Sequence, residues 1–356
     1  MLSPDIMTWF DPSILHWLGV SLILNGFVAY LWNKKFYSKL GLKVYQAAQR
    51  IHLNETPRLG GFIFILSLIG FLTQCHLGEG AAILNLMLIS LIPAILVGLK
   101  EDLFHDVKPV LRLISLFFVG YLFLSIYTGP LPNITEVHFL SKLLLLQGGI
   151  SLFYILGMVG VANGMNLIDG VNGLCVAATL SMLTTILFLS YKTGDTAMLA
   201  VTFSLILLLI PFMLFNFPFG KIFLGDLGAY SLGLMASMLT IILFGRHPEL
   251  SPYAAALILI YPVTEIVFTI LRRLFRGKSI FKPDKLHLHL KLFYFLLHQS
   301  PYKKIANPLV TLALSSLWTF PLLGIPWTYQ KSLFAIVTIV LFVVLYLSIY
   351  LIFPKY

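Results

Sequence analysis

The chain is a succession of long apolar runs separated by short polar connections. Each run is about 17 to 25 residues long, which suffices for a helix to cross a bilayer, and none alternates with the two-residue period of a barrel strand. We therefore expect an all-α, polytopic transmembrane helical bundle in which residues 1–356 form one integral membrane domain. The runs predict eleven spans, at residues 14–32, 59–76, 83–99, 111–128, 144–162, 174–191, 197–215, 228–245, 253–270, 308–325 and 332–352.

The composition excludes a water-soluble fold. Hydrophobic residues make up 59% of the chain and charged residues 11%, and the mean hydropathy is +0.93. Cys75 and Cys175 lie in or beside apolar runs without metal-type spacing, which predicts packing residues rather than a disulfide or a zinc site. Asp5 and Asp11 precede the first run instead of basic residues, so we expect a retained span rather than a cleaved signal peptide.

The basic residues predict how the chain is oriented in the membrane. With the N-terminus outside, the inner segments are residues 33–58, 100–110, 163–173, 216–227, 271–307 and the C-terminal tail. All lysines and arginines then fall in these segments or at an inner helix end, except Lys142, Lys192, Arg246 and Lys331. The positive-inside rule therefore predicts an external N-terminus and a cytoplasmic C-terminus. The net charge of +10 is explained by lipid head groups and implies no nucleic-acid partner.

Acidic residues gather at the predicted inner ends of three spans. Glu101, Asp102 and Asp106 follow the third span, Asp169 the fifth and Asp226 the seventh. Carboxylates at one depth repel one another unless a cation or proton lies between them. Hard oxygen ligands suit Mg²⁺, or Mn²⁺ in its place, bridging the phosphates of a substrate. The alternative is that these are solvated loop acids without a role.

Glycines flank two of these acids, in residues 169–173 and 225–228. A missing Cβ lets the backbone approach a phosphate closely, and a helix that starts just after such a segment points its first amides at an anion. Glycine is also frequent in membrane helices for packing alone, so that explanation stays open.

Five segments, all at predicted inner ends and in the same order, resemble the polyprenyl-phosphate N-acetylhexosamine-1-phosphate transferase superfamily of glycosyltransferase family 4. They are Thr56-Pro57-Arg58-Leu59-Gly60-Gly61, Gly98 to Asp102, Asn163 to Leu174, Asn216 to Gly228 and His287-Leu288-His289. The resemblance implies a Mg²⁺-dependent phosphotransferase. It implies catalytic roles for Glu101, Asp102 and Asp226, with Asp226 and Asp102 as metal ligands. It also implies a substrate-binding set, with Asp169 near the uracil ring, that comprises Asn166, Asp169, Asn172, Asn216, His287 and His289.

The chain departs from the family pattern at three places. The first acid of a paired-aspartate motif is Glu101, which keeps the charge but adds a methylene. The second acid of an Asp-Gly-x-Asp-Gly pattern is Asn172, which keeps hydrogen bonding and loses the charge. A histidine cluster is reduced to His287 and His289, whose side chains share a direction if the backbone is extended and diverge on a helix. We interpret Lys221, in the segment before Asp226, as a snorkelling anchor rather than a catalytic cation.

The resemblance implies that UDP-N-acetylhexosamine and undecaprenyl phosphate are the substrates and that a lipid-linked sugar and UMP are the products. The expected location is the bacterial inner membrane, with the site facing the cytoplasm, in cell wall or O-antigen synthesis. A homodimer is left open. The alternative within the family is a phospho-MurNAc-pentapeptide transferase. Alternatives of another class are a secondary transporter or an inactive lipid-phosphate binder; the acids lie at one face rather than at midplane, which disfavours the transporter.

Overall fold

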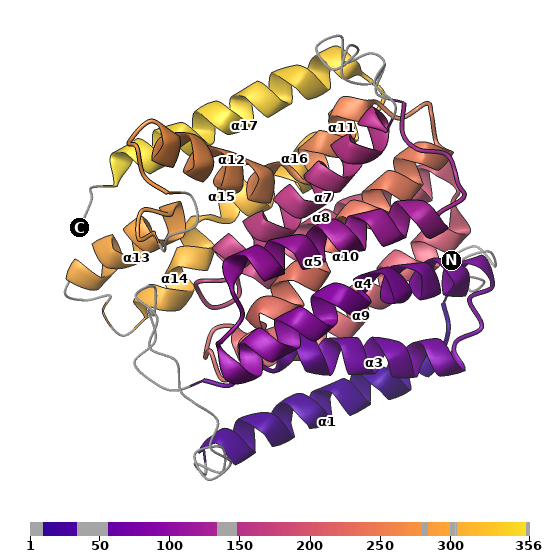
Figure 1. The fold of residues 1–356 in the computed structure, drawn as a ribbon, viewed down its shortest axis with the longest axis horizontal. Coiled ribbons are helices and arrows are strands. Elements are labelled where there is room, and N and C mark those ends of the chain that lie inside the picture. The colour runs from indigo at the N-terminus through magenta and orange to yellow at the C-terminus, as the bar shows by residue number, and fades with distance from the viewer. Residues whose placement is uncertain are drawn as a thin grey trace, which may run out of the picture.

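The computed structural model describes residues 10–33, 56–133, 148–279, 284–299, 303 and 305–353, and these residues form helices and no β-strand (Figure 1). The expectation of an all-α bundle is confirmed. The helices are α1 (Ser13–Asn33), α3 (Gly60–Gln74), α4 (Glu79–Phe104), α5 (Pro109–Ile126), α7 (Gly149–Ile168), α8 (Leu174–Thr193), α9 (Thr196–Asn216), α10 (Gly225–Arg246), α11 (Pro252–Ile258), α12 (Ile260–Leu274), α13 (Leu288–His298), α14 (Ala306–Ala313), α15 (Ser315–Trp318), α16 (Phe320–Thr328) and α17 (Ser332–Ile352).

Within the described part of the chain, 8 helices are long and apolar enough to cross a membrane. Two bent helix pairs raise this number to 10 if each pair is one span, and α3, with 15 residues, is shorter than the others. The predicted number of eleven spans and the predicted orientation of the termini stay predictions. Parts of the predicted connections, residues 34–55 and 134–147, lie outside the described residues.

Two of the predicted spans, at residues 253–270 and 308–325, are broken rather than continuous. The first is divided into α11 and α12 with a bend of 78°, and the second bends by 41° between α14 and the α15–α16 segment. Proline explains the first break because it lacks the N–H that would continue a helix, and Pro262 lies in the first turn of α12. The second break, at Leu314, has no proline beside it.

Helix α10 forms the centre of the bundle. Every residue from Gly225 to Gly245 is buried, and the helix packs against α3, α4, α7 and α8. Small residues permit this close packing. A Cβ on Gly61 of α3 would lie 2.4 Å from the Gly228 backbone, and one on Gly98 of α4 would lie 2.6 Å from the Leu227 Cα. Several glycines of the sequence motifs therefore pack helices rather than face a ligand.

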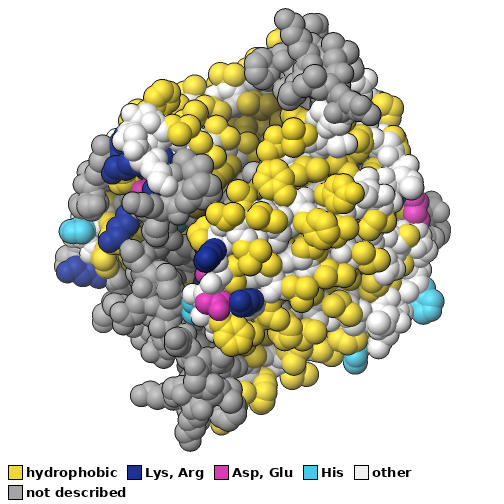
Figure 2. Space-filling view, in the orientation of Figure 1, with side chains coloured by type: hydrophobic (Ala, Val, Ile, Leu, Met, Phe, Trp, Pro, Cys, Tyr) yellow, Lys and Arg dark blue, Asp and Glu magenta, His cyan; other side chains and the backbone are white. Residues whose placement is uncertain are grey.

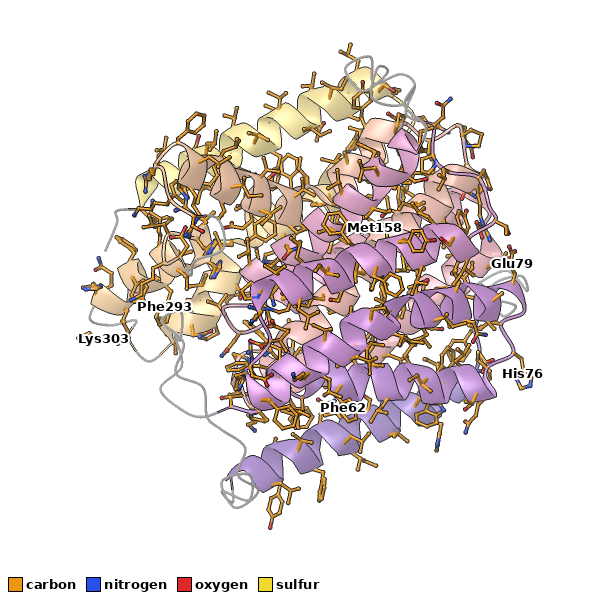
Figure 3. The ribbon with its side chains drawn as sticks, in the orientation of Figure 1. Phe62, His76, Glu79, Met158, Phe293 and Lys303 are labelled. Atoms are coloured by element: carbon orange, nitrogen blue, oxygen red, sulfur yellow. The ribbon has the colours of Figure 1, made fainter. Side chains whose placement is uncertain are left out.

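Outside this core the surface is largely apolar. Figure 2 shows hydrophobic side chains across most of one face, with most of the visible charged side chains on the left and few on the right. At one end α4, α7 and α9 end while α5, α8 and α10 begin, and we call this the site end. At the other, which we call the far end, lie His76 and Glu79; Phe293 and Lys303 are on the side of the site end (Figure 3). An apolar belt between two polar ends is what a membrane-spanning bundle requires.

Candidate active site

The predicted acids meet at the site end of the bundle. Glu101 and Asp102 lie in the last turn of α4, Asp169 directly follows α7, and Asp226 lies in the first turn of α10. The sequence placed them in connections, but the helices extend further than the apolar runs that predicted them. The acids are therefore held by helix ends, which fixes them more firmly than loops would.

Asp102 holds the start of α10. Its Oδ1 accepts the backbone N–H of Asp226 at 2.8 Å, and its Oδ2 accepts that of Leu227 at 3.0 Å. Gly225 makes this possible because its φ is +78°, and a Cβ there would lie 2.4 Å from the Asp102 Oδ2. The first amides of α10 do face an anion, as expected, but this anion is the Asp102 carboxylate.

Asp226 lies between two arginines. Its Oδ1 is 3.3 Å from the Arg58 Nη2, and its Oδ2 accepts a hydrogen bond of 2.6 Å from the Arg112 Nη1. The Arg58 Nε is also 3.8 Å from the Asp102 Oδ1, and the Arg112 Nη1 is 3.5 Å from the Glu101 Oε1. We call Arg58, Glu101, Asp102, Arg112, Asp169 and Asp226 the carboxylate–arginine cluster.

Glu101 and Asp102 are neighbours in sequence but bind different elements. The Glu101 Oε2 accepts the backbone N–H of Val107 at 3.0 Å, just before α5, whereas Asp102 binds the start of α10. The longer glutamate side chain spans from α4 to both Val107 and Arg112. The departure from the family's aspartate at Glu101 therefore has a local structural use.

The Arg58 side chain is placed by a backbone ladder between two distant segments. Gly60 and Gly61 donate their N–H groups to the Phe223 and Leu224 carbonyls at 2.9 Å each, and Phe223 donates to the Pro57 carbonyl at 2.8 Å. These bonds lay the segment around Arg58 against the turn that leads into α10. Burial lowers the pKa of the Arg58 guanidinium, but the surrounding carboxylates outweigh this and raise it above its usual value.

Asp169 completes the cluster from the end of α7. It interacts electrostatically with Arg58, Asp226 and Asp102, and it accepts a hydrogen bond from the Gly225 N–H. Burial raises the pKa of Asp169 well above its usual range; Arg58 opposes this, and the two other aspartates add to it. Asp169 therefore holds a proton more readily than an exposed aspartate does. Asn166, one turn earlier on α7, reaches the Asp226 carboxylate.

Asn172 and Asn216 tie the loops around the cluster together. The Asn216 Oδ1 accepts the Gly173 N–H at 2.6 Å, and its Nδ2 donates to the Ile222 carbonyl at 2.8 Å. The Asn172 Nδ2 donates to the Pro218 carbonyl at 2.8 Å. An aspartate at position 172 has no donor for that carbonyl, so the loss of charge there accompanies a specific loop contact. Both residues stay predicted substrate-binding residues, and their present contacts are structural.

His287 and His289 lie side by side. His287 has extended backbone angles immediately before α13, and His289 lies in the first turn of that helix. Because the helix starts between them, the rings face the same way, with centroids 5.7 Å apart and an interplanar angle of 9°. A Cβ on Gly170 would lie 2.5 Å from the His289 Nε2, so the pair borders the loop that carries Asp169. Burial lowers the pKa of His289 to about 3, against the attraction of Glu265.

Lys221 and the cysteines form no hydrogen bond or ion pair with the described residues of the cluster. The Lys221 side chain is exposed, with its Nζ 5.2 Å from the centre of the Phe219 ring, which agrees with a snorkelling anchor. Cys75 and Cys175 are free thiols, and the prediction that they form no disulfide is confirmed.

The cluster fits a magnesium ion shared with a substrate, but not a closed metal cage. Within the described ranges, no three His, Cys, Asp or Glu side chains form a metal-binding group. Mg²⁺ is usually held by one or two carboxylates together with water and substrate phosphates. Asp226 supplies such a carboxylate, and its two guanidinium partners are groups that also bind phosphate. The Asp102 oxygens accept backbone N–H groups of a helix start, which cannot turn away, whereas the partners of Asp226 are side chains, so Asp226 is the better ligand of the two.

Three polar residues near the site were not predicted from the sequence as site members. Arg58 lies in the Thr56–Gly61 motif, and Arg112 lies at the inner end of a predicted span. The sequence alone attributes the positive charge of both to contacts with lipid head groups. Glu265 was missed although it is the one acidic residue inside a predicted span, and an intramembrane carboxylate is by itself a signal of function. It accepts a hydrogen bond from Tyr346 and lies against His287.

Comparison with known proteins finds similar transferases. A protein from Bacillus subtilis (strain 168) described as a probable undecaprenyl-phosphate N-acetylglucosaminyl 1-phosphate transferase is 28% identical over 266 residues, which cover 74% of this chain and 72% of that protein. An undecaprenyl-phosphate alpha-N-acetylglucosaminyl 1-phosphate transferase from Thermotoga maritima is 28% identical over 243 residues, covering 68% and 69%. A phospho-N-acetylmuramoyl-pentapeptide-transferase from Streptococcus pneumoniae (strain Taiwan19F-14) is 25% identical over 293 residues, covering 76% and 85%.

A sequence model described as glycosyl transferase family 4 matches residues 84–244. This range contains α4, α5 and α7 to α10 almost entirely, and with them all four acids of the carboxylate–arginine cluster. The apolar bundle, the acids at its site end and these relatives agree with this match: over residues 84–244 the chain is similar to glycosyl transferase family 4.

Proposed function

We propose that this protein transfers an N-acetylhexosamine-1-phosphate from a UDP-sugar to undecaprenyl phosphate, which starts a cell-envelope glycan such as O-antigen. The observation that carries the proposal is the carboxylate–arginine cluster at one end of an apolar helical bundle. A site at a helix end lets a lipid phosphate enter from the membrane while its tail stays in hydrocarbon. The names of the relatives from Bacillus subtilis and Thermotoga maritima support the same acceptor and sugar.

We further propose that the protein lies in the bacterial inner membrane with its site end facing the cytoplasm. Lys192, Arg246 and Lys331 lie at the far end, whereas the site end carries a larger set of basic residues. Positive residues favour the cytoplasmic face. UDP-sugars are made in the cytoplasm, so a donor site there has direct access to its substrate.

The proposed reaction is a phosphoryl transfer. An ionised oxygen of undecaprenyl phosphate attacks the sugar-bound phosphorus of the UDP-sugar, the anhydride bond to the other phosphorus breaks, and UMP leaves with the electron pair. Such a reaction leaves the protein little covalent work, so catalysis comes from positioning the reactants and stabilising charge. No protein nucleophile is needed.

The residues of the cluster have distinct proposed roles. Arg58 and Arg112 bind phosphate oxygens, for which the planar guanidinium is suited. Asp226, with Asp102 as the neighbouring acid, would hold a magnesium ion, which when bound supplies positive charge to the diphosphate. Asp102 also keeps Asp226 in place through the amides at the start of α10. Asp169 and Asn166 border the nucleotide, and a protonated Asp169 can donate a hydrogen bond there.

A transfer assay tests the proposal. The protein is purified into nanodiscs and given Mg²⁺, undecaprenyl phosphate and radiolabelled UDP-GlcNAc or UDP-GalNAc, with Asp226→Asn protein from the same host as the control for contaminating enzymes. We expect label in the lipid fraction and equimolar UMP, abolished by EDTA and restored by Mg²⁺ or Mn²⁺. Folded protein that transfers no label from any UDP-sugar would refute the proposal, and activity that survives EDTA would remove the metal from it.

A second candidate is phospho-MurNAc-pentapeptide transfer, since the relative from Streptococcus pneumoniae bears that name. The reduced histidine pair favours the smaller substrate. Adding UDP-MurNAc-pentapeptide to the same assay decides between the two. Transfer from the pentapeptide substrate alone would replace the first proposal by the second.

A further inference from the structure

Helix α12 is polar on its buried face and apolar on its exposed face. Its buried polar side chains are Glu265, Thr269, Arg272 and Arg273, whereas Val267, Leu271 and Leu274 are exposed. Polar and charged groups inside a membrane bundle are expensive to bury, and they persist where they pair with one another and serve a function. Glu265, which is 0% exposed, is therefore a candidate for a role in the site.

Both carboxylate oxygens of Glu265 have a partner. The Oε1 lies 3.1 Å from the His287 Nδ1, and the Oε2 accepts a hydrogen bond of 2.7 Å from the Tyr346 hydroxyl. The Thr269 hydroxyl lies 3.4 Å from the same His287 nitrogen. These contacts join α12, the residue before α13 and α17, so three elements fix one imidazole ring.

The His287 ring is connected to the active site through His289. His287 stacks on His289, and the His289 Nε2 abuts Gly170, the residue after Asp169. Helix α12 is also locked to α7, since a Cβ on Gly164 would lie 2.2 Å from the Pro262 carbonyl oxygen. The carboxylate of Glu265 is thus connected through the two rings to the loop of the carboxylate–arginine cluster.

We propose that Glu265 is a positioning residue that holds His287 with its proton on Nδ1 and thereby leaves Nε2 for the sugar-phosphate part of the substrate. This inference rests on the proposed function. A carboxylate accepts and cannot donate when ionised, so it dictates which ring nitrogen carries the proton. Tyr346 holds the second oxygen of Glu265, which gives α17 a part in the site although it lies outside the residues matched by the family.

The proton position is tested directly by NMR. Protein labelled with ¹⁵N-histidine in nanodiscs gives the protonation state of each ring nitrogen, and a His287→Gln spectrum assigns the signal. We expect a protonated Nδ1 for His287 in the wild type and a change of that signal in Glu265→Gln, because an amide presents a donor as readily as an acceptor. A wild-type spectrum in which the His287 Nδ1 is unprotonated would overturn the proposal.

Kinetics test whether the positioning matters. Glu265→Gln should lower kcat/KM for the UDP-sugar by about 10- to 100-fold, as loss of a group that orients a functional histidine does. Glu265→Asp, which keeps the charge, should retain more activity, and Tyr346→Phe should fall between it and the wild type. Tyr154→Phe is the matched control, because its buried hydroxyl also donates one hydrogen bond, 2.6 Å to the Pro132 carbonyl, but at the far end.

The alternative is that Glu265 merely fastens three elements together. In that case Glu265→Gln and Tyr346→Phe lower the melting temperature, while kcat/KM per folded molecule and the His287 signal stay as in the wild type, and the proposal is refuted. If Glu265→Gln fails to fold, the wild-type spectrum and Tyr346→Phe kinetics still decide. If the wild type transfers no sugar phosphate, the proposed function fails, and the spectrum decides on Glu265 independently.

Discussion

Both ends of the bundle carry a cluster of charged residues, and the two clusters differ in burial. At the site end, Asp102 and Asp226 have side chains that are only 1% and 4% exposed; both contact Arg58, and Asp226 also contacts Arg112. At the far end Arg246 contacts Glu79 and Asp195, and His247 contacts Asp195 and Glu249. There the side chains of Glu79 and Glu249 are 63% and 49% exposed.

This difference separates charges that fasten helices from charges that serve chemistry. The far-end cluster caps α9, since the Asp195 Oδ1 accepts the Met198 N–H at 2.9 Å, and its two glutamates are exposed, so their ion pairs contribute little to stability. The site-end cluster sets two buried and two half-buried acids against two half-buried arginines. Burying ion pairs gives no clear gain in stability over an apolar core, so such an arrangement is maintained for another purpose.

The largest effect on turnover is expected for Asp226→Asn at the site end. The amide keeps the size of the side chain but removes the charge that faces two arginines and that we assign to a metal ion. We expect kcat to fall about 1,000-fold or more, because charge stabilisation is the main catalytic contribution in this kind of reaction. The transfer assay gives the rate, and the melting temperature in detergent reports the fold. Activity within tenfold of the wild type would remove Asp226 from the metal role.

Arg112→Gln is expected to have the next largest effect. It removes a guanidinium that bonds Asp226 at 2.6 Å and that we assign to substrate phosphate. We expect kcat/KM for the UDP-sugar to fall about 100-fold, as for loss of one charge-stabilising donor. Arg112→Lys should recover part of this loss because it keeps the charge without the fork geometry. Equal activity of the Gln and Lys variants would mean that charge at this position has no role in the reaction.

The sequence predicted the site through the alternation of helices and missed what long-range packing adds. Apolar runs and basic connections sufficed to bring Asp102, Asp169 and Asp226 to one end. The arginines that pair with Asp226 lie 168 and 114 positions away in sequence, so no local pattern linked them to it. The bend before α12 was also missed, because an apolar run has the same appearance whether or not a proline breaks it.

A pH experiment compares a buried histidine at the site end, His289, with a histidine at the far end, His247. Burial lowers the pKa of His289 to about 3, whereas an unfolded histidine titrates near 6.5. Below pH 6.5 the unfolded chain therefore binds a proton that the folded protein refuses, so this residue makes stability fall as the pH falls. The expected loss is about 1 kcal/mol between pH 6.5 and 5.5.

His289→Gln should remove this contribution, and its melting temperature should decline less than that of the wild type over the same pH interval. His247→Gln at the far end controls for the loss of an imidazole as such. If the melting temperature of the His289→Gln variant falls as much as that of the wild type between pH 6.5 and 5.5, the buried ring is not held neutral in the folded protein.

The smallest effect is expected for Arg246→Gln at the far end. Arg246 is the counterpart of Arg112 in that it joins the end of one helix to acids on two others, Glu79 on α4 and Asp195 before α9. Glu79 is largely exposed, and the buried Asp195 keeps His247 and the Met198 N–H as partners. We therefore expect a loss of less than about 1 kcal/mol in the free energy of unfolding and a transfer rate within about twofold of the wild type. Arg112→Gln and Arg246→Gln each remove one guanidinium, the first at the site end and the second at the far end of the same bundle. A loss of turnover at the far end as large as that at the site end would show that the arginines act through the rigidity of the bundle, because no substrate phosphate can reach both ends at once.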